Sequence, residues 1–531
     1  MRTVYYNGQI YTGEKMQEAF VVEDDQFIFV GKNEDALKYN YDNIVDLEGQ
    51  FVCSGFNDSH MHFVNYGNVL SNALLTGCSD SLEHLCQYLK EFIEEHHFEK
   101  GSWIKGRGWN HDFFTDVKRM PNRHDLDKVS TEYPICITRV CGHCLVVNTK
   151  GLECLGIDVN DENVDESIRN GIFYDDTLET VYEAIPVPSK DDIKNMLKIA
   201  SYHLNSYGVT SCQSDDYCTF RSVPWEVINQ AYQELKDENE LTVRVYEQAN
   251  FVCLDDLKEF VEAGYYTGKG HNMFKIGPLK ILGDGSLGAR TAYISEPYRN
   301  DHTTSGMLCL EEKVIDEMVN YAHKHDMQVA IHTIGDKCLD VVLDAYEKAI
   351  NEYPRGNHRH GIVHCQITRD DQLKRMRDLN LCVYAQSIFL DYDIQIIYDC
   401  VSDKLASTSY SWKTLLDSGV VVGNGTDCPV ELPNALGGIQ CAVTRKNLKG
   451  TLGPYLPAQA FSVDEALKSY TIAGAYTSFE EDVKGYIKEG YLADFVVLKD
   501  NPLSRDVDKI KDIEVLETYL GGNRVYKKEV A

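Results

Sequence analysis

The two ends of the chain share one pattern, in which apolar and polar residues alternate over short runs separated by turn residues. Residues 1–53 contain MRTVYYNGQIYTG, AFVVEDDQFIFVGK and NIVDLEGQFV, and residues 485–531 contain GYLADFVVLKDNP and IEVLETYLGGNRVYKK. Such alternation predicts β-strands with one buried face. Because neither end is long enough to enclose a core alone, we expect the two to combine in one composite β-sandwich.

Between the ends, residues 54–484 alternate short apolar runs with amphipathic segments, which predicts βα units around a parallel sheet. Eight runs qualify as strands: FVCSGF before His60, GVTSCQ from Gly208, LTVRVYEQ from Leu241, KIGPLKIL from Lys275, MQVAIH from Met327, GIVHC from Gly361, LCVYAQ from Leu381 and GVVVGNG from Gly419. Eight parallel strands indicate an α/β protein with a TIM-like (β/α)8 barrel. The first two runs are farther apart than one crossover helix requires, so we expect an insertion at about 101–188 over the barrel mouth.

Three histidine pairs have one residue between their members: His60 and His62, His323 and His325, and His358 and His360. Side chains at i and i+2 share a face on a strand but diverge on a helix. The second pair ends an amphipathic helical segment, so we interpret both members as cations near a helix C-terminus. The third lies in a polar, glycine-flanked stretch that is typical of a loop. Only the first pair follows a strand-like run and can direct both imidazoles at one metal.

In a (β/α)8 barrel, chemistry collects where the strands end. Six metal-binding candidates stand at or beside such ends: His60, His62, Lys280, His332, His364 and Asp427. Alone, His332 or His364 could be a hydrogen-bonded core histidine, and Asp427 could cap a helix. A lysine inside an apolar strand is harder to explain, because a buried ammonium is costly unless it is neutralised or paired. Together these residues supply the nitrogen and oxygen ligands that suit Zn²⁺, with open positions for water.

Several motifs carry a family resemblance: GFNDSHMHF, LKILGDGSLGARTAYISEPY, VAIHTIGDKCLD, HRHGIVHCQ, GNGTDCPV and EALKSYTIAGAYT followed by GYIKEGYLADFVVL. In this order they resemble the amidohydrolase superfamily, in its YtcJ-like branch of metal-dependent hydrolases that is similar to N-substituted formamide deformylase. The resemblance implies that His60, His62 and Asp427 bind one metal, usually zinc. It also implies that His332 and His364 bind a second metal, with Lys280 bridging the two after carboxylation by CO2.

The implied activity is hydrolysis of a C–N bond in an amide, formamide or cyclic amide by metal-activated water, with Asp427 as the catalytic base. Trp109 and His143 match positions that the family keeps near the substrate. Asp284 and Arg290 could bind substrate or form a structural ion pair. One departure concerns the residue before His364, which is usually glutamate in this branch and is Val363 here. A second departure, GYLAD near the C-terminus in place of Gly-Lys-x-Ala-Asp, looks harmless.

The net charge and the cysteine content limit the binding partners and the cellular location that can be expected. The chain has 52 Lys and Arg against 83 Asp and Glu, a formal net charge of −31, which disfavours nucleic acid and anionic membranes as partners. No run approaches the length of a membrane helix, and the N-terminus lacks a signal peptide pattern. Many of the 17 cysteines lie in strand-like runs, which indicates a reducing, cytoplasmic location. The expected partner is a small-molecule substrate, and a homodimer is one possible assembly.

Three other functions stay open. A ring deaminase could use the same metal site, and a regulatory or scaffold protein could retain an idle barrel, although no ligand is lost here. Cys141 and Cys144 in VCGHCLVV have the spacing of a redox dithiol. They lack the strand and following helix that surround thioredoxin-type sites, so we rank this alternative last.

Overall fold

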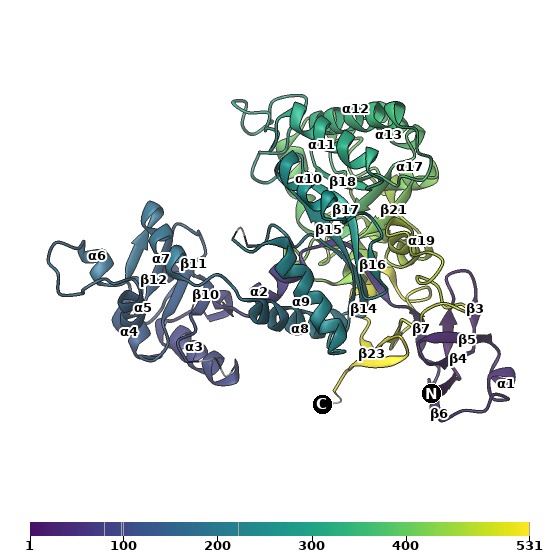
Figure 1. Ribbon diagram of the computed structural model, residues 1–531, viewed down its shortest axis with the longest axis horizontal. Coiled ribbons are helices and arrows are strands. Elements are labelled where there is room, and N and C mark those ends of the chain that lie inside the picture. Colours follow the sequence, from purple (N-terminus) through teal and green to yellow (C-terminus); the bar gives the residue numbers. More distant parts are fainter. Residues whose placement is uncertain (79, 97, 99, 221, 530–531) are drawn as a thin grey trace. The chain divides into compact units, whose positions relative to one another are not determined.

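The computed structural model describes residues 1–78, 80–96, 98, 100–220 and 222–529. The chain forms two compact units, one made of Met1–Tyr66 with Ile193–Ala531 and the other of Gly67–Asp192 (Figure 1). The second unit is wider than the insertion expected at about 101–188, because its sheet and helices also include segments from residue 73 onward. No helix in the described ranges is both long and apolar enough to cross a membrane.

Eight parallel strands form the barrel of the first unit, in the spatial order β8, β14, β15, β17, β18, β19, β20 and β21. Their bounds are Phe56–Met61, Val209–Ser214, Arg244–Asn250, Phe274–Leu282, Val329–Thr333, Gly361–His364, Cys382–Ala385 and Val421–Asn424. Helices cover the outside of this sheet (Figure 1), among them α9 (Trp225–Asp237), α10 (Leu254–Glu262), α11 (Glu312–Lys324), α12 (Asp336–Glu352) and α13 (Asp370–Asp378). The predicted (β/α)8 barrel is confirmed, and its C-terminal strand ends share one mouth.

The run FVCSGF was expected as the first barrel strand, and this expectation is wrong in detail. Phe51–Ser54 forms β7 of a terminal sheet, and the barrel strand β8 begins only at Phe56. Gly55 joins the two strands. A Cβ atom there would lie 2.2 Å from Thr210 Oγ1 on β14, so the close approach of two strands requires glycine where the chain passes from one sheet to the other.

The ends of the chain form two terminal sheets, the first from N-terminal strands alone and the second from strands of both ends. The first has the order β5, β4, β1, β6, with bounds Gln26–Gly31, Ala19–Glu23, Arg2–Tyr6 and Asn43–Asp46. The second has the order β24, β23, β22, β7, β2, β3, with β24 at Asn523–Lys527, β23 at Val515–Leu520, β22 at Phe495–Leu498, β2 at Gln9–Tyr11 and β3 at Met16–Gln17. One apolar core joins the ends, since Tyr5 and Phe20 pack with Phe495 and Tyr519. A buried ion pair between Arg244 on β15 and Asp494 fastens this core to the barrel.

The second unit contains one mixed sheet with the order β13, β12, β11, β10, β9. Its strands are Ile172–Tyr174, Cys144–Val147, Ile135–Arg139, Ile104–Trp109 and Ala73–Leu74. Helix α3 (Leu82–His96) buries Leu85 and Leu89 against Ile104 and Ile137 of this sheet. The unit therefore has a hydrophobic core of its own.

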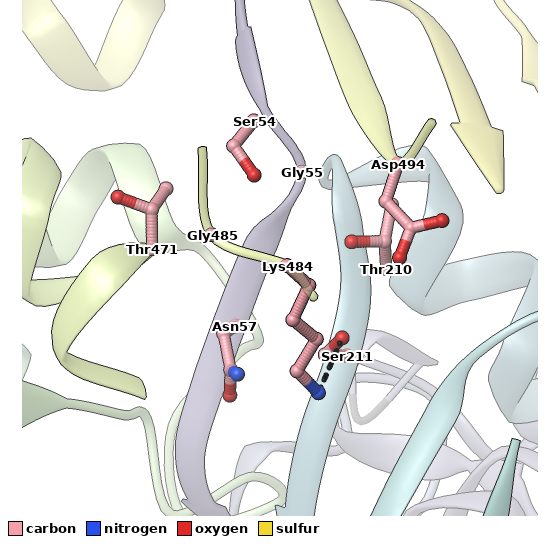
Figure 2. Close-up of a pocket in the computed structure, with 9 residues that line it drawn as sticks. All are labelled: Ser54, Gly55, Asn57, Thr210, Ser211, Thr471, Lys484, Gly485 and Asp494. Atoms are coloured by element: carbon pink, nitrogen blue, oxygen red, sulfur yellow. Dashed lines mark hydrogen bonds between the residues drawn. The ribbon is translucent and has the colours of Figure 1, made fainter. Parts of the chain in front are cut away.

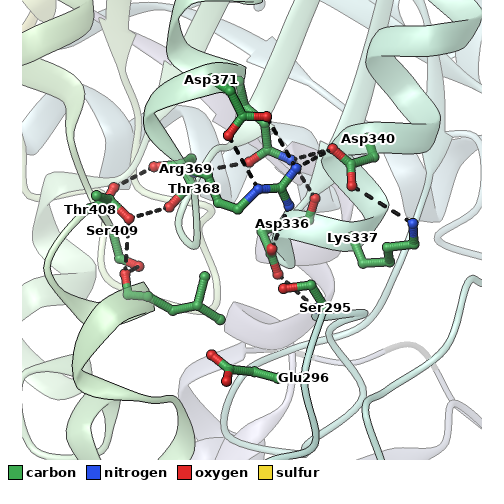
Figure 3. Close-up of polar contacts among 12 residues, drawn as sticks. Ser295, Glu296, Asp336, Lys337, Asp340, Thr368, Arg369, Asp371, Thr408 and Ser409 are labelled. Carbon is green, nitrogen blue, oxygen red and sulfur yellow. Dashed lines mark hydrogen bonds and ion pairs between the residues drawn. The ribbon is translucent and has the colours of Figure 1, made fainter.

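The segment that follows β19 is tied to the outer helices by a network of charges (Figure 3). Arg369 donates to Asp336 and Asp340 of α12, each at 2.6 Å, and also contacts Asp371 of α13. Asp336 is fully buried, so its pairing with Arg369 offsets the cost of removing a carboxylate from water. Because this segment begins directly after His364, the network restrains the backbone that leaves a candidate ligand.

Candidate metal centre

Three predicted ligands meet where the first and last barrel strands adjoin. His60 lies within β8, His62 follows that strand directly, and Asp427 follows β21. The Asp427 N–H donates to the His60 carbonyl, and the His62 N–H donates to the Cys428 carbonyl, both at 2.8 Å. The buried Asp58 accepts the N–H and hydroxyl of Thr426 and so joins the same two segments. Asp427 does not cap a helix, because the next helix, α18 (Ala435–Thr444), is capped by Asn434.

The side chains of these three residues converge. Asp427 Oδ1 lies 3.0 Å from His62 Nε2 and 3.4 Å from His60 Nε2. One ligand atom from each residue lies within 4.8 Å of the others, a spacing that a single metal ion can bridge. The His62 side chain is 29% exposed whereas that of His60 is 1% exposed, so His62 is the more open of the two to solvent.

His332 and His364 form the other half of the centre. His364 Nε2 lies 2.9 Å from His332 Nδ1, and the His60 and His364 ring centroids are 5.6 Å apart. Their strands β18 and β19 are neighbours, so the parallel register brings the two imidazoles together. The structure thus brings all four predicted histidines into one cluster with Asp427.

The hydrogen bonds on the far side of each ring fix where its proton lies. His60 Nδ1 faces Gln248 Oε1 and His364 Nδ1 faces Gln386 Oε1, both at 2.7 Å. Each glutamine is oriented by its own NH2 group, which donates to a backbone carbonyl, of Ser59 and of Tyr384 respectively. An amide oxygen can only accept, so both Nδ1 atoms must carry the proton.

The other two rings are anchored by backbone carbonyls. His62 Nδ1 donates to the Asp215 carbonyl at 3.0 Å, and His332 Nε2 donates to the Gly285 carbonyl at 3.2 Å. In the neutral rings the four remaining nitrogens are therefore unprotonated, and they face one another or the Asp427 carboxylate. Lone pairs at 2.9 to 3.4 Å repel unless a proton or a metal cation lies between them, so the donor set fits a metal.

The electrostatic environment keeps most of these rings neutral. Burial, reinforced by the charge of Lys280, lowers the pKa of His332 to about 3 and the pKa values of His60 and His364 well below the usual value. Burial also opposes the charged form of His62, but the hydrogen bond and charge of Asp427 outweigh it and raise the pKa of His62 to about 9. Neutral imidazole is the form that binds metals.

Lys280 projects from β17 next to this cluster and is 2% exposed. Its Nζ lies 3.4 Å from Asp215 Oδ2, and Asn250 donates to the same carboxylate. The unmodified lysine is therefore paired rather than isolated. Val363, the departure beside His364, packs with Ala330 and Tyr384 in an apolar cluster.

The backbone at His364 is held in an unusual conformation. His364 has a φ of 72° and Cys365 a φ of 53°, both in the left-handed region. The Trp412 indole N–H lies 3.1 Å from the carbonyl oxygens of both residues and donates to them. Phe389 stacks on the His364 ring with centroids 5.8 Å apart.

Asp284 and Arg290 do not form the ion pair that the sequence left open. Asp284 is buried and accepts the backbone N–H groups of Tyr293, Ile334 and Gly335. It thus braces the loop after β17 against the loop after β18, and burial raises its pKa to about 7. Arg290 is exposed and donates to Asn300.

Trp109 and His143 lie in the second unit. Trp109 is fully buried in the core of that unit, and the exposed His143 contacts Asp175. Cys141 and Cys144 are both free thiols, at the hairpin turn between β11 and β12 and not at the start of a helix. The two cysteines therefore lack the following helix of a thioredoxin-type redox site, as expected from the sequence.

The interpretation of His323 as a cation at a helix end is wrong. Helix α11 does end at Lys324, and the exposed His325 contacts the Tyr321 carbonyl. His323, however, is buried, and burial lowers its pKa. It bonds to His360, which lies in the expected loop but is buried as well. Packing against a distant loop, which the helical pattern does not reveal, explains the difference.

Three residues of the centre were missed in the sequence: Asp215, Gln248 and Gln386. They stand in or directly after β14, β15 and β20, the strands for which no candidate was named. The rule that identified the ligands, polar residues where strands end, also applies to these three.

A barrel with this convergent donor set at its mouth defines a metal-dependent hydrolase. The model of the Amidohydrolase family matches residues 43–526, so the chain belongs to that family. It is 29% identical to putative amidohydrolase YtcJ of Bacillus subtilis, over 99% of this chain and 100% of the relative. It is 24% identical to N-substituted formamide deformylase of Arthrobacter pascens, over 91% of this chain and 90% of the relative. A solved structure of an uncharacterized metal-dependent hydrolase from Pyrococcus horikoshii has a TM-score of 0.77 at 30% identity, covering 96% of this chain and 99% of the other.

Proposed function

We propose that the chain hydrolyses a C–N bond of a small amide, formamide or cyclic amide with zinc as its metal. The main support is the convergence of four imidazole nitrogens, three of them in rings that burial keeps neutral, with the Asp427 carboxylate, a donor set that suits Zn²⁺. The relative named N-substituted formamide deformylase supports an amide or formamide as the substrate.

In this proposal His60, His62 and Asp427 hold one zinc ion, and His332 and His364 hold a second. Lys280 would bridge them after carboxylation. An ammonium at Lys280 opposes the charged form of all four histidines and would repel a metal for the same reason. Carboxylation replaces that cation with an anionic ligand, which favours metal binding.

Zinc, when bound, polarises a carbonyl and lowers the pKa of water. Asp427 would accept the proton of the attacking water and transfer it to the leaving nitrogen. Gln248 and Gln386 would hold His60 and His364 in the tautomers that leave Nε2 free. Trp109 and His143 stay predictions as substrate-binding residues.

The first experiment measures zinc per chain, with and without bicarbonate, together with amine release from a panel of amides and formamides. Two zinc ions per chain are expected in the wild type and fewer in Lys280→Met. Lys484→Met is a matched control, because Lys484 is also buried and paired, with Glu480, but lines the pocket of Figure 2 at the starts of β8 and β14. Absence of bound zinc after incubation with zinc and bicarbonate would refute the proposal.

A further inference from the structure

Exposed apolar side chains gather on the loops that follow the barrel strands. We call Leu282, Met307, Val430 and Leu432 the apolar rim; their exposed fractions are 43%, 63%, 64% and 58%. All four follow or end β17 and β21, the strands that carry Lys280 and lead to Asp427. Single exposed apolar residues are ordinary, but several around one mouth indicate a binding surface.

The direction of Leu282 follows from strand geometry. Leu282 is two residues after Lys280 on β17, so both side chains point to the same face of the strand. Its backbone partner in the parallel register is His332. Leu282 therefore lies on the same face of β17 as Lys280 and next to His332, at the solvent-exposed end of the strand.

The neighbouring loop brings Met307 to the same place. Cys309 donates to the Gly283 carbonyl at 2.8 Å, and Leu308 bridges to Asp284. Met307 thus runs beside the segment 283–285, which supplies the carbonyl that anchors His332.

The other half of the rim follows Asp427. The Val430 N–H donates to the Asp427 carbonyl at 2.8 Å in a tight turn, and Leu432 lies two residues farther on. Their apolar side chains are exposed to solvent.

We propose that the apolar rim binds a hydrophobic substituent attached to the scissile C–N bond. The inference rests on the proposed hydrolase function. It narrows the substrate class from amides in general to amides with an alkyl or aryl group.

The test compares an N-hexyl formamide with an N-(5-carboxypentyl) formamide of equal chain length. We expect kcat/KM to be at least tenfold higher for the hexyl compound, mainly through KM. In Leu432→Lys the preference should fall to threefold or less. Leu452→Lys, at an exposed leucine on the loop after α18, is the matched control and should keep the wild-type preference.

Binding of the same two compounds to metal-free protein, measured by ligand-observed NMR, separates the two proposals. If neither compound is hydrolysed by zinc-loaded enzyme but the hexyl compound binds more tightly, the hydrolase proposal fails. The proposal that the apolar rim binds a hydrophobic group is then retained. If both are hydrolysed with equal kcat/KM, or bind equally, the apolar rim has no such role.

Discussion

Two clusters of buried histidines lie at opposite ends of the same two barrel strands. At the C-terminal ends of β18 and β19, His332 and His364 belong to the candidate metal centre. At the N-terminal ends, His360 precedes β19 and contacts Val329, the first residue of β18, together with His323 of α11. Residue type and burial are alike in the two clusters, so neither property identifies the metal site.

The difference lies in the hydrogen bonds. His323 donates through Nε2 to the Tyr353 carbonyl and accepts at Nδ1 from His360 Nε2, and His360 accepts at Nδ1 from the Val329 N–H. Every proton in this chain has one acceptor, so the cluster is complete without a cation. At the other end the unprotonated nitrogens of His332 and His364 face each other, and that of His60 faces the Asp427 carboxylate. A missing proton between facing acceptors, and not the number of histidines, therefore marks the metal centre.

The largest effect is expected from Asp427→Asn. The change keeps the shape of the side chain but removes the negative charge and the proposed base. Turnover should fall by about 10²- to 10⁴-fold, the usual contribution of a general base, and bound zinc should decrease. Elemental analysis and amine release measure the two effects. Full activity in this variant would remove Asp427 from the mechanism.

The second-largest effect is expected at the glutamines that accept hydrogen bonds from the rings of His60 and His364. Gln386→Leu removes the acceptor of His364 Nδ1–H, so the ring loses its fixed tautomer and orientation. Zinc affinity should fall by about 10- to 100-fold. Competition with a chromophoric chelator measures the dissociation constant. Gln328→Leu is a control, because Gln328 is also a buried glutamine but bonds to Tyr246, Tyr384 and nearby carbonyls away from the ligands. An equal loss in both variants would point to a general packing effect.

A substitution in the cluster of His323 and His360 should lower the stability of the fold and leave zinc binding unchanged. His360→Leu leaves the Val329 N–H and His323 Nδ1 without partners, which should lower the free energy of unfolding by roughly 1–3 kcal/mol. Zinc per folded chain should stay at the wild-type level. Urea denaturation of metal-free protein and elemental analysis are the measurements. Loss of zinc with unchanged stability would reverse the roles assigned to the two clusters.

The same variant should change how stability depends on pH. Burial lowers the pKa of His358 to about 4 and that of His360 well below its usual value, so the folded cluster stays neutral while the unfolded chain takes up protons below about pH 6.5. Stability from this cluster is complete above about pH 6.5 and decreases as the pH falls. His360→Leu should reduce the slope between pH 6.5 and 5 by up to about 1.4 kcal/mol per pH unit, one proton. An unchanged slope would mean that His360 is already charged in the native state.

The sequence predicted the barrel well because apolar runs and amphipathic segments alternate through residues 209–424, and each predicted run contains or touches a barrel strand. It also predicted the cluster of four histidines and Asp427, since parallel strands bring their C-terminal ends together. It could not predict that His323 is buried, because the partner His360 lies 37 residues away in another loop. For the same reason it missed that Asp284 braces two loops: the three N–H groups that it accepts are set by tertiary contacts.

The smallest expected effect tests whether backbone strain at a ligand contributes to metal binding. His364 and Cys365 have left-handed backbones, whereas at the other cluster Arg359 has one and His360 itself does not. Non-glycine residues adopt this conformation at a cost of about 1–3 kcal/mol each, so surrounding contacts must hold them. Trp412 donates to both carbonyls, and Trp412→Phe removes this donor but keeps an aromatic ring. Zinc affinity should fall by roughly five- to tenfold, about the value of one hydrogen bond.

Trp225→Phe is the control, because the Trp225 ring packs on Phe260 and Tyr265, and this variant should leave zinc affinity unchanged. If Trp412→Phe lowers the melting temperature but not zinc affinity, Trp412 supports the fold alone and the strain at His364 has no part in metal binding.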